Sequence, residues 1–119
     1  MKTRIATTAA TGIVLAFGVP GAETAERTET GIASVYSYES GNQTASGQKL
    51  NAEALTAAHK TLPFGTKVLI TNKSNGKTVV VIINDRGPFI RGRIIDVTPA
   101  GARALGFSGL APVKIEVVS

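Results

Sequence analysis

A single carboxylate at the end of an apolar strand is the residue of this chain best placed to do chemistry. Asp85 lies in the run Asn84-Asp85-Arg86-Gly87-Pro88-Phe89, directly after the β-branched residues Val79 to Ile83. Such a β-branched run predicts a strand buried on both faces, and the Gly-Pro pair stops that strand with a turn. Asp85 would then sit at a rim, partly exposed, where a carboxyl group can act as a general acid or base. The alternative is that its side chain only caps the turn.

The lone histidine, His59, is the second candidate for chemistry. It follows an alanine run, where a single histidine is often a structural residue with satisfied hydrogen bonds, although imidazole can also transfer protons or orient a ligand. One histidine in a chain without cysteine does not supply an ordinary metal-ligand set. We therefore expect no metal and no cofactor.

Strands must position these residues. Residues 66–72 and 77–84 are expected to form two strands joined by Lys73-Ser74-Asn75-Gly76, because Asn-Gly is a strong hairpin signal. Further strands are expected at 31–38, 93–97 and 112–118, the last because Val113, Ile115 and Val117 alternate with charged residues.

One short helix is expected between the last two strands. Thr98 is a good N-cap, Pro99 suits the first helical position, and Gly106 suits the residue beyond the end. Residues 51–59 are ambiguous, since their alanines favour a helix capped by Asn51 while 56–59 could equally be extended.

The N-terminus resembles an export signal. Lys2 and Arg4 precede a mostly apolar stretch from Ile5 to Val19, and small residues follow near a possible cleavage point. We assign residues 1–22 to a signal peptide, 23–30 to a flexible leader and 31–119 to one domain. A disordered N-terminal extension is the alternative, and a membrane span is not favoured because it needs about 18 uninterrupted apolar residues.

Composition narrows the class of partner. The 119-residue chain carries a net charge of +5, which favours anionic partners by long-range attraction. It has no recognisable nucleic-acid-reading motif, so we expect no nucleic acid and favour an anionic cell-wall polymer. Because the sequence contains no cysteine, we expect no disulfide and no lipid anchor on a mature N-terminal Cys.

Several motifs together resemble the rare lipoprotein A (RlpA-like) family. They are Gly31-Ile32-Ala33-Ser34-Val35-Tyr36, Thr44-Ala45-Ser46-Gly47, the segment Leu55–Thr66 with His59 in its middle, the Asn84–Phe89 run, and Arg93-Ile94-Ile95-Asp96. The resemblance spans 31–119 in order. It implies a mainly β fold, a six-stranded double-psi β-barrel with one or two short helices, shared with expansins.

The resemblance also implies an activity. Characterised members are lytic transglycosylases that cleave peptidoglycan glycan strands between N-acetylmuramic acid and N-acetylglucosamine without water, leaving a 1,6-anhydro end. One carboxyl group suffices, because it can protonate the leaving oxygen and then take the proton of the muramic 6-hydroxyl. Asp85 matches the catalytic Asp of the family and would have to hold a proton near neutral pH, which partial burial favours. Arg86 should therefore point away from it.

Other site residues follow from the same motifs. His59 matches a second site residue and could hydrogen-bond Asp85 or orient the sugar, while Gln48, Tyr36, Arg86 and Lys60 are expected to bind substrate. Gln48 departs from the Glu common in active members, and glutamine cannot carry a proton. Asp96 could contact substrate or, more simply, lie near the positive end of the following helix. Phe64 and Phe89 are expected in the core.

Two functions remain open at this stage. The first is an exported, monomeric lytic transglycosylase in the periplasm or outside the cell. The second is a non-catalytic, expansin-like module that binds or loosens wall glycan with the same groove, which the substitution at Gln48 favours. A secreted partner of another wall enzyme is a third possibility.

Overall fold

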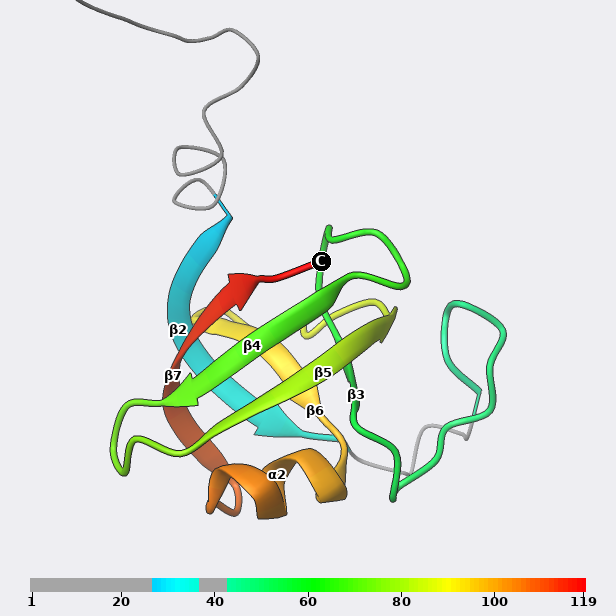
Figure 1. Ribbon diagram of the computed structural model, residues 1–119. Coiled ribbons are helices and arrows are strands. Elements are labelled where there is room, and N and C mark those ends of the chain that lie inside the picture. The colour runs from blue at the N-terminus through cyan, green and yellow to red at the C-terminus, as the bar shows by residue number, and fades with distance from the viewer. Residues whose placement is uncertain (1–26, 37–42) are drawn as a thin grey trace, which may run out of the picture.

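A computed structural model describes residues 27–36 and 43–119 (Figure 1). The expected signal peptide and the first half of the expected leader, residues 23–26, lie outside the described residues. Within the described part, six strands and one helix follow each other along the chain: β2 (Thr28–Val35), β3 (Thr56–Ala58), β4 (Lys67–Asn72), β5 (Thr78–Asp85), β6 (Arg93–Val97), α2 (Pro99–Leu105) and β7 (Leu110–Val117).

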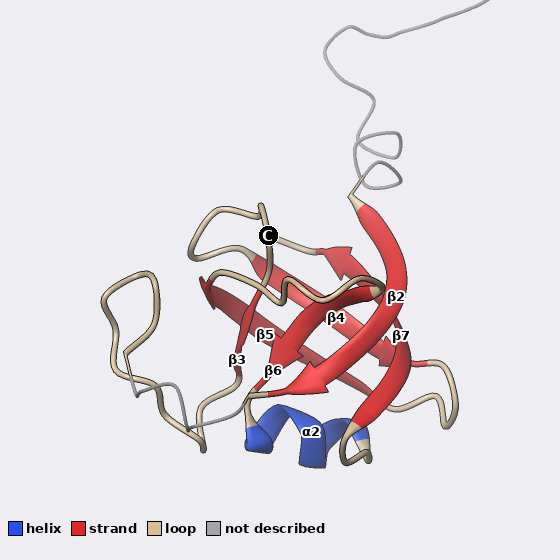
Figure 2. Cartoon of the chain, turned by 180° about the vertical axis from the view of Figure 1, so that it is seen from behind, coloured by secondary structure: helices blue, strands red, loops and turns tan. Residues whose placement is uncertain are grey.

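The six strands close into a barrel, in the order β2-β6-β3-β5-β4-β7 (Figures 1 and 2). Strands β2 and β6 pair in parallel, as do β3 and β5, whereas the other neighbours are antiparallel. Closure gives each of these strands a neighbour on both sides, which suits a small domain without disulfides. The expected mainly β, six-stranded double-psi barrel is confirmed.

The barrel interior is filled by aliphatic side chains from every strand. In β4 and β5 alternate residues point inward, so that Val68, Ile70, Val81 and Ile83 are fully buried. The outer face of β5 is different, because Val80 and Ile82 are more than two-fifths exposed. The β-branched run therefore marks a strand with one buried face and one partly open apolar face, not a strand covered on both sides.

Helix α2 lies across one end of the barrel and buries Ala102 and Leu105 against it (Figure 2). Its boundaries follow the expected caps. The Thr98 hydroxyl accepts a hydrogen bond from the Gly101 amide, and Gly106 takes a left-handed conformation with φ of 73°. No helix in the described part of the chain is long and apolar enough to cross a membrane.

The structure adds to the sequence-based predictions at two places, the start of the first strand and the ambiguous segment 51–59. The first strand begins at Thr28, so residues assigned to the flexible leader pair with β7, from Thr28 opposite Glu116 onward. The ambiguous segment 51–59 is not helical, because Thr56–Ala58 form β3 between β5 and β6. Tertiary pairing outweighs the helix propensity of its alanines. The Asn-Gly hairpin, the strand at 93–97 and a last strand, now at 110–117, are confirmed.

Candidate active site

The Asp85 carboxylate is held by three hydrogen bonds at the end of β5. The Tyr36 hydroxyl donates to Oδ2 at 3.0 Å, while the amides of Ala45 and Arg86 donate to Oδ1 at 2.7 and 2.8 Å. The side chain remains partly exposed. Three hydrogen bonds from different parts of the chain hold this half-buried carboxylate in one orientation.

The fold brings these donors together from distant parts of the chain. β5 ends at Asp85 because Gly87, with φ of 114°, turns the chain in a conformation that favours glycine. Tyr36 follows β2, and its amide donates to the Val97 carbonyl of β6. The segment carrying Ala45 reaches Asp85 from outside the barrel. Sequence order alone could not show that Ala45 donates a main-chain hydrogen bond here.

Asp96 lies two strands away from Asp85, with Ala58 opposite both of them in register. Its carboxylate accepts a hydrogen bond from the Ser34 hydroxyl at 3.2 Å. Burial raises the pKa of the Asp96 carboxyl above its usual value of 3.8, and the charge of Asp85 adds to this, while the Ser34 bond and Arg93 oppose it. The carboxylate is thus hydrogen-bonded to Ser34 of the neighbouring strand β2.

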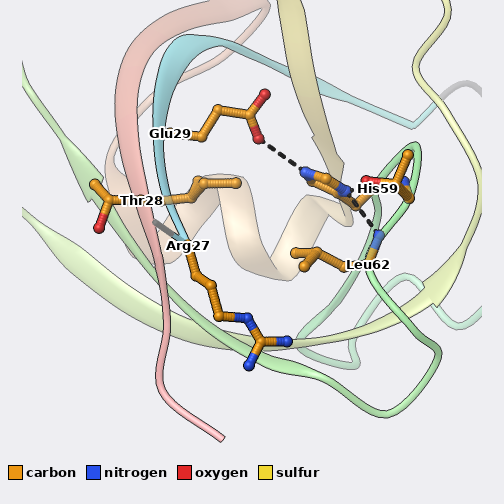
Figure 3. Close-up of a pocket in the computed structure, with 7 residues that line it drawn as sticks. Arg27, Thr28, Glu29, His59 and Leu62 are labelled. Atoms are coloured by element: carbon orange, nitrogen blue, oxygen red, sulfur yellow. Dashed lines mark hydrogen bonds and ion pairs between the residues drawn. The ribbon is translucent and has the colours of Figure 1, made fainter. Parts of the chain in front are cut away.

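His59 is buried and its ring is bound on both nitrogens (Figure 3). The amides of Thr61 and Leu62 both donate to Nδ1 at 3.1 Å, so the neutral ring carries its proton on Nε2 and donates it to Glu29 at 2.9 Å. The expected side-chain bond to Asp85 is not formed. The two residues are joined through the main chain, where the His59 amide donates to the Asp85 carbonyl at 3.1 Å.

A pocket of about 260 Å³ lies beside the His59 ring. In Figure 3, Glu29 of β2 and the turn after His59 approach the ring from opposite sides. Its lining residues are Arg27, Thr28, Glu29, His59, Thr61, Leu62 and Ile115. Glu29 is the hydrogen-bond partner of His59 that the sequence did not indicate, because the first strand was expected to begin only at Gly31.

Arg86 points away from the Asp85 carboxylate, as expected. Its Nη1 donates to the carbonyls of His59 and Leu62 at 3.2 and 2.8 Å, and its guanidinium lies 4.2 Å from the centre of the Phe64 ring. This side chain therefore holds the 59–65 turn in place. Lys60, on the same turn, is exposed.

Gln48 is exposed and contacts the end of β5 through Asn84. Its Oε1 accepts hydrogen bonds from Asn84 Nδ2 at 3.1 Å and from the Ser46 hydroxyl at 3.4 Å. A cleft of about 370 Å³ opens here, lined by Ser46, Gln48, Phe64, Gly65, Ile82, Ile83 and Asn84. Asn84 precedes Asp85 in β5, but Asp85 itself is not among the residues that line this cleft.

The prediction that the phenylalanines lie in the core is wrong for both residues near the site. Phe64 is 43% exposed at the cleft and Phe89 is 78% exposed in the loop after Asp85. The aliphatic residues already fill this small barrel, which leaves the rings for the surface. Exposed aromatic rings are suited to binding sugars, whose apolar faces stack on rings.

The closed six-stranded barrel, with an oriented carboxylate at the end of one strand, defines a double-psi β-barrel protein with a candidate site for acid–base chemistry. Residues 28–116 match the model of the family described as "Lytic transglycolase". The chain belongs to this family.

Curated relatives agree with this assignment. The protein named "Probable endolytic peptidoglycan transglycosylase RlpA" from Nostoc sp. is 57% identical over 93 residues, which are 74% of this chain and 25% of that protein. The "Endolytic peptidoglycan transglycosylase RlpA" of Neisseria meningitidis is 50% identical over 102 residues, 83% of this chain and 43% of that protein. The chain thus spans less than half the length of these relatives.

Solved structures with the same fold include expansins. The apo expansin of Clavibacter michiganensis is 26% identical, with a TM-score of 0.60, over 77% of this chain and 50% of that one. A point mutant of the expansin from the same organism, solved with cellohexaose, is 25% identical with the same TM-score and the same coverage.

Proposed function

We propose that this domain is an exported lytic transglycosylase that cleaves peptidoglycan glycan strands between N-acetylmuramic acid and N-acetylglucosamine. The observation that carries the proposal is the oriented, partly exposed carboxylate of Asp85, held by Tyr36, Ala45 and Arg86. Membership of the lytic transglycolase family and the names of the relatives support the substrate and the reaction.

Asp85 performs both proton transfers. In protonated form it gives its proton to the glycosidic oxygen as the bond to the anomeric carbon breaks. The resulting carboxylate then removes the proton of the muramic 6-hydroxyl, whose oxygen closes on the anomeric carbon to give the 1,6-anhydro end. No water is consumed, so a second carboxylate to activate water is not needed. The Tyr36 hydroxyl suits both states, since it can donate to the carboxylate and accept from the acid.

The remaining residues have supporting roles in this proposal. His59 and Arg86 hold the 59–65 turn, and through it Phe64, beside the acid. Gln48 binds the sugar in the cleft, and exposed Lys60 attracts the anionic polymer. The domain acts on the wall as a monomer after export, with residues 1–22 as the signal peptide.

The proposed reaction is tested by identifying its product. Purified protein is incubated with glycan strands, and the products are searched by mass spectrometry for anhydromuramyl ends, in parallel with Asp85→Asn. Glu53→Gln serves as a matched control, because Glu53 is an exposed carboxylate paired with Arg103 on the surface away from the site. Anhydro product from the wild type and the control, lost in Asp85→Asn, supports the proposal.

An expansin-like binding module is the second candidate. The likeness to an expansin solved with a glucan chain favours it, as does a glutamine at position 48. Retention on sacculi with no anhydro product from either wild type or Gln48→Glu would support this candidate and exclude the enzyme. Failure to bind sacculi and to form product would exclude both.

A further inference from the structure

His59 joins the turn after β3 to the residues around the acid. Its amide donates to the Asp85 carbonyl at 3.1 Å, and its carbonyl accepts from Arg86 Nη1 at 3.2 Å. Its ring holds the turn itself, because Nδ1 accepts the amides of Thr61 and Leu62, both at 3.1 Å. A displaced His59 would therefore shift the main chain that carries the Asp85 carboxyl, and the geometry of a reacting group depends on such supporting contacts.

The remaining polar atom of this residue is bound from another part of the barrel. His59 Nε2 donates to Glu29 Oε1 at 2.9 Å (Figure 3). In the barrel order β6 separates β2 from β3, but β2 pairs with β6 only from Ile32 onward, whereas it pairs with β7 from Thr28 onward. The bond between Glu29 and His59 thus connects β2 to the turn after β3 at a level where β6 has not yet begun.

The His59 ring lacks packed neighbours on one side. The pocket of about 260 Å³ includes His59 in its lining, so part of the ring faces this space and has no packing contacts there. The hydrogen bond to Glu29, whose side chain is 47% exposed, holds the ring in place at this point. A water molecule could accept from Nε2 instead, but it would not tie the ring to β2.

The Glu29–His59 pair does not have the arrangement of a proton relay. In a catalytic triad, a carboxylate orients a histidine whose other ring nitrogen takes a proton. Here the other nitrogen, Nδ1 of His59, already accepts two main-chain amides. Glu29 therefore acts on the position of the ring and not on proton transfer to a substrate.

We propose that Glu29 is a positioning residue for Asp85. By accepting the Nε2 proton it ties the His59 ring to β2, and His59 in turn binds the Asp85 carbonyl and the Arg86 guanidinium. The requirement is an acceptor oxygen at the correct distance from β2, and the charge of the carboxylate is not needed. This inference rests on the proposed function, and it adds to the site a residue that acts on the acid through His59.

Two substitutions of Glu29 separate reach from charge. Glu29→Asp keeps the carboxylate but shortens the side chain by one methylene group, so its oxygens should no longer reach His59 Nε2. Glu29→Gln keeps the length and an acceptor oxygen and removes the charge. Glu116→Asp is the matched control, because Glu116 lies on β7 opposite Thr28 and pairs with Lys114. The barrel should stay folded in all three variants, because neither glutamate is buried.

The first measurement is the initial rate of anhydro-end formation over a range of glycan-strand concentrations. Glu29→Asp should lower kcat by about three- to tenfold and change KM by less than about twofold, because a displaced acid slows the chemical step without removing a contact with the strand. Glu29→Gln and Glu116→Asp should keep at least about half of the wild-type kcat. A wild-type kcat in Glu29→Asp, or an equal loss in Glu29→Gln, would overturn the proposal.

Main-chain NMR signals test the same inference without turnover. The amides of Ala45 and Arg86 donate to Asp85 Oδ1, so their signals report where the carboxyl lies. We expect them to shift in Glu29→Asp and to keep their wild-type positions in Glu29→Gln and Glu116→Asp. Unshifted signals in Glu29→Asp would contradict the positioning role. A wild type that forms no anhydro product would defeat the proposed function, and these signals would still decide the role of Glu29.

Discussion

Asp85 and Asp96 face the same residue, Ala58, from the strands on either side of β3, yet their surroundings differ. Asp85 ends its strand, is partly exposed and accepts three hydrogen bonds. Asp96 lies inside its strand, where burial raises the pKa of its carboxyl, and accepts a hydrogen bond from Ser34. Both side chains are half-buried, so the two carboxyls differ in the groups that hold them and not in their exposure.

The turn after β3 lies on the Asp85 side and is connected by hydrogen bonds to the strands around it. His59 and Arg86 tie that turn to β2 and to the end of β5, on the Asp85 side. On the other side, Asp96 is held by the Ser34 hydroxyl and by the charge of Arg93. A reactive carboxyl needs surroundings that orient it and leave one side free.

The largest expected effect is on the rate of cleavage. Asp85→Asn should lower the initial rate of anhydro-end formation by about 10²–10⁴-fold, the usual contribution of a general acid or base. Asp96→Asn should lower it by less than about tenfold, because Asp96 acts on the site only through its charge. Equal losses in the two variants, both shown to be folded by circular dichroism, would remove the distinction between the two carboxyls.

His59→Ala tests the support on the Asp85 side. We expect the free energy of unfolding, measured by urea denaturation, to fall by about 1–3 kcal/mol, because the amides of Thr61 and Leu62 lose their acceptor. Lys60→Ala, an exposed neighbour, should change it by less than about 0.5 kcal/mol. Lost activity with unchanged stability would mean that the ring acts directly on substrate.

The hydroxyl donors to the two carboxylates can be removed separately. Tyr36→Phe should cost about 1 kcal/mol of stability and lower kcat severalfold, because Asp85 loses the donor to Oδ2. Ser34→Ala removes the donor to Asp96 and should cost a similar stability with kcat nearly unchanged. If kcat fell in Ser34→Ala and not in Tyr36→Phe, the roles of the two acids would have to be exchanged.

The smallest effect concerns pH. Because burial raises the pKa of the Asp96 carboxyl in the folded chain, the folded state binds its proton more tightly than the unfolded state. The stability that this proton contributes is fully present when the pH is below 3.8, the usual pKa of the carboxyl. It is lost as the pH rises through the higher pKa that the carboxyl has in the folded chain. Between about pH 4 and 7, the free energy of unfolding of the wild type should therefore fall relative to that of Asp96→Asn as the pH increases. A difference independent of pH would contradict this.

Local sequence patterns were sufficient to predict much of the fold. The Asn-Gly hairpin, the caps of α2 and the strand at 93–97 depend on neighbouring residues, and the structure has them as expected. Barrel closure came from the resemblance to a family, because pairing β2 with β6 and β3 with β5 requires contacts that no local pattern specifies. The choice between helix and strand at 56–58 depended on the same distant contacts.

The site was predictable to a lesser degree. The half-buried position of Asp85 at the end of its strand and the direction of Arg86 followed from the sequence. The contact of Glu29 with His59, the Ala45 amide and the exposed rings did not. Every residue except proline has a backbone N–H, so residue type does not show that Ala45 donates here. Glu29 was not considered because it precedes the expected start of the domain. The phenylalanines were misplaced because hydrophobicity predicts burial only when the core has room for the side chain.

The three donors to Asp85 also bear on how the protein becomes active. Tyr36 and Ala45 lie 49 and 40 positions before it, and the strands next to Tyr36 and Asp85, β2 and β5, are joined through β6 and β3. Such distant pairings form slowly and late in folding. A chain in which these four strands have not yet paired therefore lacks the Tyr36 bond to Asp85, so the acid should become oriented only when this part of the barrel has assembled.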